Sequence, residues 1–467
     1  MKKLYIDCSY LSNHPHLNTG IQRVVRKIVE GLFKEATSYG FQPILVSLRD
    51  SNATILPLDA IAHRPLKEAQ NKAQTVSFKK HLIEYLKNLY LHTKLWFSAL
   101  IPSATFRHFM MAPKNQFGLN YILYHMLYHP IKSIFSFSNK PPSKTSKNGF
   151  PFEVSNTDTL LLIDSSWYMN IWESVHTFKQ KGGRVEMVLY DLIPIAYPQF
   201  CDAFLAKVFK EWVDESLGYV DGYIAISKTV QKEIMHYAQT HAPKRAKTIQ
   251  FGYFYLGADF QSTKTSINEN IRDSLKELMK ERPTFITVST LEPRKNHAYL
   301  LDTFEQLWDD GIDINLLLIG RQGWLVDELL KRIKNHSEYN KRLFFFDDIN
   351  DTELDYAYHH AKALLFASFV EGFGLPIIEG LEKGLPVFAS DIPVHREIGK
   401  NAVIYFNLND KKALAKTIYS FLKEPFSPPL KHKKWINWDE STHMLLQVLM
   451  NHSPSTSTSM SLQAKKF

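Results

Sequence analysis

The sequence predicts an α/β protein with two doubly wound domains, each built on a mostly parallel sheet. Its 467 residues are too many for one ordinary core and indicate two domains of roughly 200 residues each. Hydrophobic residues make up 45% and charged residues 22% of the chain, the balance typical of a globular protein. Short apolar runs alternate with helical patterns in both halves. This alternation favours parallel sheets whose functional loops lie at the carboxyl ends of the strands.

The first domain is expected at residues 1–260. It opens with a short apolar strand at 4–6 and a polar loop up to Gly20. A helix is expected from Ile21 to Phe33, where the apolar residues recur on one helical face. Further apolar runs predict strands at 44–48, 160–163, 185–189 and 223–226.

The second domain is expected at residues 261–430, and the polar stretch 261–270 at its start is expected to contain the linker between the domains. A strand at 285–288 precedes a helix for which Asn296 is the expected cap. A terminal helix at 431–452, able to cross back to the first domain, and a disordered tail at 453–467 complete the expected organisation. The remaining strands of the second sheet are expected at 315–319, 342–346, 363–366 and 387–389.

The net charge of +9 is concentrated in one segment, at about 65–150, which looks like an insertion into the first domain. Twelve lysines and arginines there oppose two glutamates, so the segment carries +10 and the rest is nearly neutral. Many aromatic residues lie among the basic ones. One interpretation is a surface that lies on anionic lipid. A solvated basic insertion packed on the first domain is the alternative, and no recognition motif supports nucleic-acid binding.

The two cysteines, Cys8 and Cys201, are too few and too far apart for a disulfide framework and favour a reducing compartment. The amino-terminal residues lack the apolar region of a secretory signal. No run of about 18 uncharged apolar residues occurs, so no transmembrane helix is expected. We therefore expect a cytoplasmic protein.

The most informative stretch runs from Glu371 to Gly384. Its glycine-rich part, 372–375, leads into a short helix, with Pro376 suited to the first turn and Gly384 to the position just after the end. Backbone N–H groups and the positive end of the helix would favour a diphosphate. Glu379 lies one or two turns into the helix, so Glu371 and Glu379 can reach different parts of one ligand. The alternative is a capping loop with two solvated acids.

This stretch resembles the paired-glutamate motif (E, seven residues, E) of the large retaining glycosyltransferase family 4. Upstream, 288–296 is similar to that family's phosphate-binding Arg-Lys segment, and 318–320 to its next strand and turn. The resemblance spans about 285–406. It implies the GT-B fold, in which two Rossmann-like domains face each other across a cleft.

The resemblance also implies roles for individual residues. Arg294 and Lys295 would neutralise the donor diphosphate as it leaves, a task that a metal performs in other enzymes. Glu379 would hold the nucleotide ribose, and Glu371 the transferred sugar. No cofactor and no metal are expected. The other residues assigned to the donor site are Gly372, Phe373, Gly374, Leu375, Gly320 and Thr290.

The first half resembles the family more weakly. Gly20 and Arg23 fall in a segment similar to its glycine loop, which touches donor phosphate or acceptor; a plain helix start is the alternative. Tyr190 stands where many relatives carry the histidine of a His-Asp pair. Asp191 remains as a catalytic candidate that could contact the reacting sugar or the acceptor.

The implied function is transfer of a sugar from a nucleoside diphosphate to a saccharide or lipid-linked acceptor, as in O-antigen or capsule assembly. The segment 19–23 and the turn 320–324 look like mannosyltransferase members, which points to GDP-mannose. The lipid-linked acceptor implies a place at the inner face of a membrane. Two alternatives are a nucleotide-sugar-binding subunit without turnover and a nucleotide-sugar epimerase of similar architecture.

Overall fold

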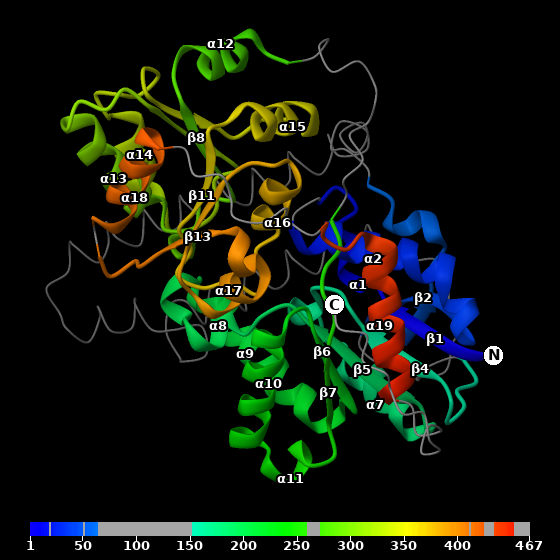
Figure 1. Ribbon diagram of the computed structural model, residues 1–467. Coiled ribbons are helices and arrows are strands. Elements are labelled where there is room, and N and C mark those ends of the chain that lie inside the picture. The colour runs from blue at the N-terminus through cyan, green and yellow to red at the C-terminus, as the bar shows by residue number, and fades with distance from the viewer. Residues whose placement is uncertain are drawn as a thin grey trace, which may run out of the picture. The chain divides into compact units, whose positions relative to one another are not determined.

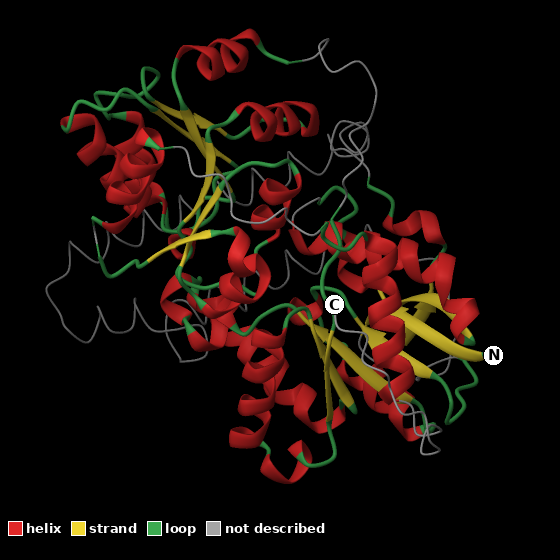
Figure 2. Ribbon diagram, viewed as in Figure 1, coloured by secondary structure: helices red, strands yellow, loops and turns green. Residues whose placement is uncertain are grey.

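The computed structural model describes residues 1–17, 20–49, 52–63, 152–258, 271–410, 412–424 and 434–452. Within them the chain forms two separate sheets, both mostly or wholly parallel and both flanked by helices (Figures 1 and 2). The basic insertion expected at 65–150, the linker at 261–270 and the tail at 453–467 lie outside the described residues.

The first sheet has seven strands in the order β3-β2-β1-β4-β5-β6-β7. All neighbours are parallel except β2 and β3, which form an antiparallel edge. The sequence patterns had indicated neither this edge strand nor β7. The strands are β1 (Lys2–Asp7), β2 (Phe41–Arg49), β3 (Asn52–Ile55), β4 (Thr159–Leu162), β5 (Arg184–Leu189), β6 (Gly222–Ala225) and β7 (Gln250–Tyr253).

Helices cover both faces of this sheet because its strands are apolar on both sides. Tyr5 faces one hydrophobic cluster, while Leu4 and Ile6 face the other. The helices are α1 (Ser9–Asn13), α2 (Gly20–Glu35), α7 (Trp172–Gln180), α8 (Ile193–Ala196), α9 (Ala203–Tyr219), α10 (Lys228–His241) and α11 (Pro243–Ala246), with short 3-10 turns η1 (Ala36–Tyr39), η2 (Leu58–Ile61), η4 (Ser166–Tyr168) and η5 (Pro198–Phe200).

The second sheet has six parallel strands in the order β10-β9-β8-β11-β12-β13. Its strands are β8 (Thr284–Val288), β9 (Asn315–Ile319), β10 (Leu343–Phe346), β11 (Ala363–Phe366), β12 (Val387–Ser390) and β13 (Ile404–Phe406). Its helices and 3-10 turns are α12 (Asp273–Glu281), η6 (Pro293–Lys295), α13 (His297–Asp309), α14 (Asp327–Lys334), α15 (Asp351–His360), α16 (Leu375–Glu382), α17 (Pro393–Gly399), η7 (Lys400–Ala402) and α18 (Ala413–Lys423).

Asn296 differs from its expected role as a cap. It occupies the position before α13, but its backbone is left-handed (φ 57°) and its side chain makes no capping hydrogen bond. The tight 3-10 turn before it fixes this conformation, which asparagine tolerates better than most residues. The predicted position of the cap is therefore confirmed, while the side-chain hydrogen bond expected of such a cap is not formed.

The last described helix, α19 (Trp438–His452), returns to the first sheet and lies beside α2 (Figure 1). Ser441 Oγ donates to the Tyr255 carbonyl (2.7 Å), and Lys34 Nζ pairs with Asp439 (2.5 Å). A Cβ at Gly31 would lie 2.1 Å from the Thr442 hydroxyl, so this close approach requires glycine.

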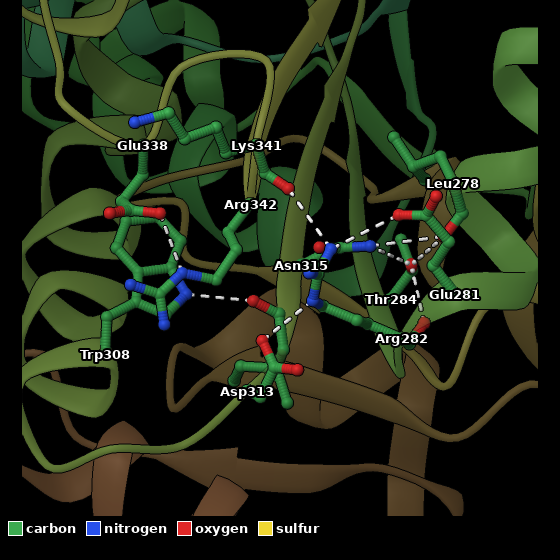
Figure 3. Close-up of polar contacts among 11 residues, drawn as sticks. Leu278, Glu281, Arg282, Thr284, Trp308, Asp313, Asn315, Glu338, Lys341 and Arg342 are labelled. Atoms are coloured by element: carbon green, nitrogen blue, oxygen red, sulfur yellow. Dashed lines mark hydrogen bonds and ion pairs between the residues drawn. The ribbon is translucent and has the colours of Figure 1, made fainter.

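A polar network cross-links the amino ends of β8, β9 and β10 (Figure 3). Arg282, just before β8, pairs with Asp313 (2.7 Å). Asn315 at the start of β9 donates to the Leu278 carbonyl (3.1 Å). Arg342, just before β10, pairs with Glu338 (2.7 Å), and its guanidinium lies over the ring of Trp308. These contacts hold the amino edge of the second sheet.

In the part of the chain that the structure describes, no helix is both long enough and apolar enough to cross a membrane.

Candidate functional site

The candidate site lies at the carboxyl edge of the second sheet, where β8 and β11 are neighbours. The chain leaves β8 and reaches Arg294 and Lys295 in the turn η6. It leaves β11 and reaches Glu371 five residues later. Pairing of the two strands therefore brings Glu371 to Arg294 and Lys295, which lie more than 70 positions earlier in the sequence.

Glu371 binds both cations at once. Its Oε2 accepts from Arg294 Nη1 (2.8 Å) and its Oε1 accepts from Lys295 Nζ (2.5 Å). Arg294 Nε also donates to Glu292 Oε2 (2.8 Å). The Lys295 ammonium lies over the ring of Phe366, with 5.0 Å to the ring centre. All three charged side chains are largely buried, with exposed fractions of 18% for Arg294, 11% for Lys295 and 8% for Glu371.

Burial and mutual attraction act in opposite directions on these groups. Burial alone would raise the pKa of Glu371, but the charges of Arg294 and Lys295 outweigh it and lower the pKa to about 2. Burial and the neighbouring Arg294 lower the pKa of Lys295, against the pull of Glu371. Glu371 is thus a carboxylate at neutral pH and is paired with two cations at the sheet edge.

The glycine-rich loop after Glu371 is shaped by close backbone contacts. A Cβ at Gly372 would lie 2.1 Å from the Tyr190 carbonyl, which belongs to the first domain. Gly374 has φ 101°, a conformation that favours glycine, and α16 begins at the next residue, Leu375. Phe373 is buried between these glycines. The start of α16 therefore lies next to Arg294, Lys295 and Glu371, which we call the charged trio.

A second glycine shapes the neighbouring loop. Gly320, directly after β9, has φ 147°, and a Cβ there would lie 2.0 Å from the Ser289 carbonyl. This contact packs the end of β9 against the segment that leads from β8 through Thr290 to Arg294. Thr290 is half-buried in that segment.

Glu379 lies on the second turn of α16 and is held by a tyrosine. The Tyr358 hydroxyl donates to Glu379 Oε2 (2.8 Å). Burial and the charge of Glu379 raise the pKa of Tyr358 well above its usual value, while the charge of Arg23 opposes the rise. Arg23, exposed on α2, is therefore within electrostatic reach of the Glu379 side of the site.

Asp191 brings the first domain to the charged trio. It follows β5, and its Oδ1 accepts from the Ile193 backbone N–H (2.9 Å). Burial raises the pKa of Asp191 above its usual value, and the charges of Arg294 and Lys295 oppose this rise without cancelling it. Its neighbour Tyr190 points elsewhere, since its hydroxyl donates to the Ile163 carbonyl (2.7 Å) inside the first domain.

The structure does not bring Gly20 to this cluster through any described contact. Gly20 is the exposed first residue of α2, with no atom within 4 Å of a Cβ placed on it. Thr19, the first residue of the segment 19–23, lies outside the described residues.

Sequence reasoning missed a buried histidine beside Glu371. His395, on α17, is fully buried, and its Nδ1 contacts the Ser390 carbonyl (2.9 Å). Its Nε2 has no hydrogen-bond partner among the described residues, and neither does the buried Ser368 hydroxyl. Burial lowers the pKa of His395 to about 4, although Glu371 pulls the other way. A single histidine within a helical segment forms no sequence pattern that would predict a buried position beside Glu371.

The sequence analysis also did not single out Asp164. It follows β4 at the carboxyl edge of the first sheet and accepts from the Leu11 backbone N–H (2.6 Å). Asp7, at the end of the adjacent β1, accepts from the Ser166 hydroxyl (2.7 Å). Burial, then the charge of Asp7, raise the pKa of Asp164 to about 7. One signal existed in the sequence, because Asp7 directly follows the apolar run 4–6 and Asp164 directly follows the apolar run 160–163.

Residues 268–438 match the family described as glycosyl transferases group 1. This region is similar to group 1 glycosyltransferases. The match contains Arg294, Lys295, Glu371 and Glu379, so the charged cluster belongs to the part of the chain that the family covers.

Curated relatives extend the similarity into the first domain. The serotype-specific mannosyltransferase WbdA of Escherichia coli is 31% identical over 316 residues, which is 65% of this chain and 38% of the relative. The O-antigen chain mannosyltransferase RfbU of Salmonella typhimurium is 27% identical over 241 residues, 51% of this chain and 61% of the relative. The chain thus spans under two thirds of either relative.

Solved structures establish the fold. The structure of Anabaena HepE in complex with UDP and glucose superposes with a TM-score of 0.53 over 97% of this chain and all of that one, at 12% identity. Sucrose-phosphate synthase from Thermosynechococcus elongatus gives 0.53 over 97% and 99%, at 16% identity. The fold is GT-B, as the sequence predicts.

Proposed function

We propose that the chain is a retaining, metal-independent hexosyltransferase that moves mannose from GDP-mannose to a lipid-linked saccharide of the O-antigen type. The observation that carries the proposal is the buried Arg294–Lys295–Glu371 cluster at the start of α16. The similarity to WbdA and RfbU, both named as mannosyltransferases, supports mannose as the transferred sugar.

The chemistry follows from the two cations, Arg294 and Lys295, at the sheet edge. The bond between the anomeric carbon and the diphosphate oxygen breaks, and a bond to the acceptor oxygen forms. The acceptor's proton passes to the departing phosphate. Arg294 and Lys295 stabilise the negative charge that develops on the leaving group. A guanidinium has five N–H donors and an ammonium three, so both can hold Glu371 and phosphate oxygens together.

The remaining residues orient the donor. The backbone N–H groups of the loop 372–375, which leads into α16, face the diphosphate, and Glu379, held by Tyr358, accepts from the ribose hydroxyls. Glu371 and the N–H groups of Phe373 and Gly374 hold the sugar. Asp191 faces the same cluster from the first domain and can position a hydroxyl of the sugar or of the acceptor.

The test is release of GDP from GDP-mannose by the purified protein, with and without a manno-oligosaccharide acceptor and with and without a chelator. We expect acceptor-dependent release that the chelator leaves unchanged, and an α-linked product by NMR. GDP release without need of an acceptor would favour the epimerase alternative, and binding without release the subunit without turnover. Loss of activity with the chelator would contradict the metal-free reaction.

We also propose that the basic segment at 65–150, outside the described residues, places the enzyme on the anionic cytoplasmic face of the inner membrane. Its charge of +10 supports this, since each basic residue near such a surface contributes about 1 kcal/mol. Co-sedimentation with anionic vesicles at low salt, reversed by high salt, is the expected result. Equal, negligible binding to anionic and neutral vesicles would overturn it.

A further inference from the structure

Three aromatic rings, two from neighbouring positions and one from a distant part of the chain, are packed nearly parallel. Phe200 lies between Tyr197 and Phe369, with ring centres 6.2 Å from the first and 5.4 Å from the second and interplanar angles of 17° and 13°. Tyr197 is 39% exposed and Phe369 42% exposed. We call these three rings the aromatic strip.

The aromatic strip is joined directly to the candidate site. The Phe369 backbone N–H donates to the Arg294 carbonyl (2.8 Å), and Phe369 precedes Glu371 by two residues. Tyr197 and Phe200 follow Asp191 along α8 and η5. The strip therefore begins where residues of both domains meet around the charged trio.

A small buried hydrophobic cluster and one hydrogen bond hold the aromatic strip in place. Ile193, Cys201 and Val370 form a hydrophobic cluster beneath it, against which Phe200 packs. Trp324 Nε1 donates to the Phe200 carbonyl (2.8 Å), and Trp324 is itself 37% exposed. The rings are thus held by a rigid base, while large parts of two of them remain in contact with solvent.

The fold does not need this exposure. Single exposed apolar residues are ordinary, but aromatic rings gathered at a site mark a binding surface. Rigid rings lose little conformational entropy on binding and present flat apolar area. An acyl chain would fit flexible aliphatic or methionine side chains better.

The absence of charged residues from the segment that carries Tyr197 and Phe200 indicates which class of ligand the aromatic strip binds. No charged residue occurs from Leu192 to Cys201, and Phe369 is followed by valine, so the strip offers flat apolar area and neutral polar groups such as the Tyr197 hydroxyl. A pyranose ring has the matching chemistry, with an apolar C–H face and neutral hydroxyls at its rim. A neutral saccharide chain is the ligand that fits.

We infer that Tyr197, Phe200 and Phe369 bind the acceptor saccharide and hold its reacting end beside Asp191 and Glu371. The inference rests on the proposed function and adds to it where the acceptor lies. The strip then sets affinity for the acceptor, whereas Arg294, Lys295 and Glu379 act on the donor.

The experiment compares Tyr197→Leu and Phe369→Leu with the control Tyr419→Leu, a tyrosine of similar exposure (41%) on α18. Leucine keeps apolar volume and, at Phe369, the backbone hydrogen bond to Arg294. With GDP-mannose and mannotetraose, each strip variant should raise the acceptor KM about five- to tenfold. The donor KM, kcat and slow donor hydrolysis without acceptor should stay within about twofold, and the control should match the native enzyme.

Direct binding supplies a readout that does not need turnover. Saturation-transfer NMR should show mannotetraose contacts with the native protein that weaken in the double variant Tyr197→Leu/Phe369→Leu. An unchanged acceptor KM and unchanged NMR contacts would overturn the inference, as would an equal rise in donor KM. Failure of the native protein to transfer any mannose, with mannotetraose still bound at the strip, would instead contradict the proposed function.

Discussion

The amino and carboxyl edges of the second sheet, where its strands begin and end, each carry an arginine–carboxylate ion pair, and the two pairs differ in burial. At the amino edge, Arg282 pairs with Asp313 at 2.7 Å, and the two side chains are 31% and 66% exposed (Figure 3). At the carboxyl edge, Arg294 pairs with Glu371 at 2.8 Å, and the side chains are 18% and 8% exposed. Distances are almost equal, but solvent screens the first pair and not the second. Burial, rather than the ion pair itself, distinguishes the reactive edge.

The pKa directions show the same contrast. At the amino edge, the hydrogen bond from Arg342 lowers the pKa of Glu338, as expected for a simple surface pair. At the carboxyl edge, burial and Arg294 lower the pKa of Lys295, and the carboxylates of Glu371 and Glu292 do not fully offset this. A site that gathers like charges at a cost in stability is typical of function.

The largest effect is expected from Glu371→Gln, which leaves Arg294 and Lys295 buried without a carboxylate between them. Breaking a buried pair in this way costs about 3–5 kcal/mol of stability. Urea unfolding measures it, with Asp313→Asn as the amino-edge control, for which about 1 kcal/mol or less is expected. Equal losses in the two variants would remove the distinction between the edges.

Lys295→Ala should next reduce turnover by about 10²–10³, with a smaller change in donor affinity, because its charge acts on the leaving group. Lys341→Ala, in the turn at the amino edge, is the matched control and should leave turnover unchanged. The measurement is kcat and KM for GDP-mannose. A variant that loses affinity but keeps kcat would place Lys295 outside the reaction step.

Acid should weaken the carboxyl edge selectively. The Glu371 carboxylate has a pKa of about 2, below its ordinary value of 4.5, so it contributes stability above the unfolded pKa. That contribution, about 3 kcal/mol, is lost as the pH falls from about 4.5 through 2. Stability measured across this range should fall less steeply in Glu371→Gln than in the native protein. Parallel curves would show that another group governs the loss.

Glu379→Ala should weaken donor binding by about 1.5–3 kcal/mol, since it removes a charged acceptor for the ribose hydroxyls. Tyr358→Phe, which removes only the hydroxyl that holds Glu379, should give a smaller loss of the same kind. Calorimetry with GDP measures both, and Glu338→Ala at the amino edge is the control. Undiminished GDP affinity in Glu379→Ala would contradict the ribose role.

The smallest effect is expected from Arg282→Ala. Its partners are largely exposed, so the loss should be about 1 kcal/mol or less, without change in turnover. Urea unfolding and the transfer assay measure the two quantities. A strong loss of activity would mean that the amino edge transmits strain to the site.

The fold could be predicted because the strands are short apolar runs buried on both faces. The runs at 285–288 and 363–366 appear as β8 and β11, and their pairing places Arg294 beside Glu371. The edge strand β3 escaped prediction because its pattern is mostly exposed. The order of the motifs in the second domain was recognised from the resemblance to glycosyltransferase family 4, because residue spacing alone does not give it.

The unpredicted parts of the site depend on contacts between distant segments. Nothing near His395 in sequence indicates that its ring would be buried close to Glu371. Likewise Phe200 and Phe369 stack although 169 positions separate them, and no sequence pattern links the two segments. Local patterns report which face of an element is apolar, but not which element will cover it.

Helix α19 has a consequence for synthesis on the ribosome. The first sheet is complete once Tyr253 has emerged, yet Leu445, Leu446 and Leu449 of α19 belong to the core beside α2. Roughly 200 residues must be translated in between, which takes about 10–40 s at 5–20 residues per second. The nascent first domain therefore waits with an uncovered apolar face, and chaperone binding during translation should concentrate on α2 until α19 emerges.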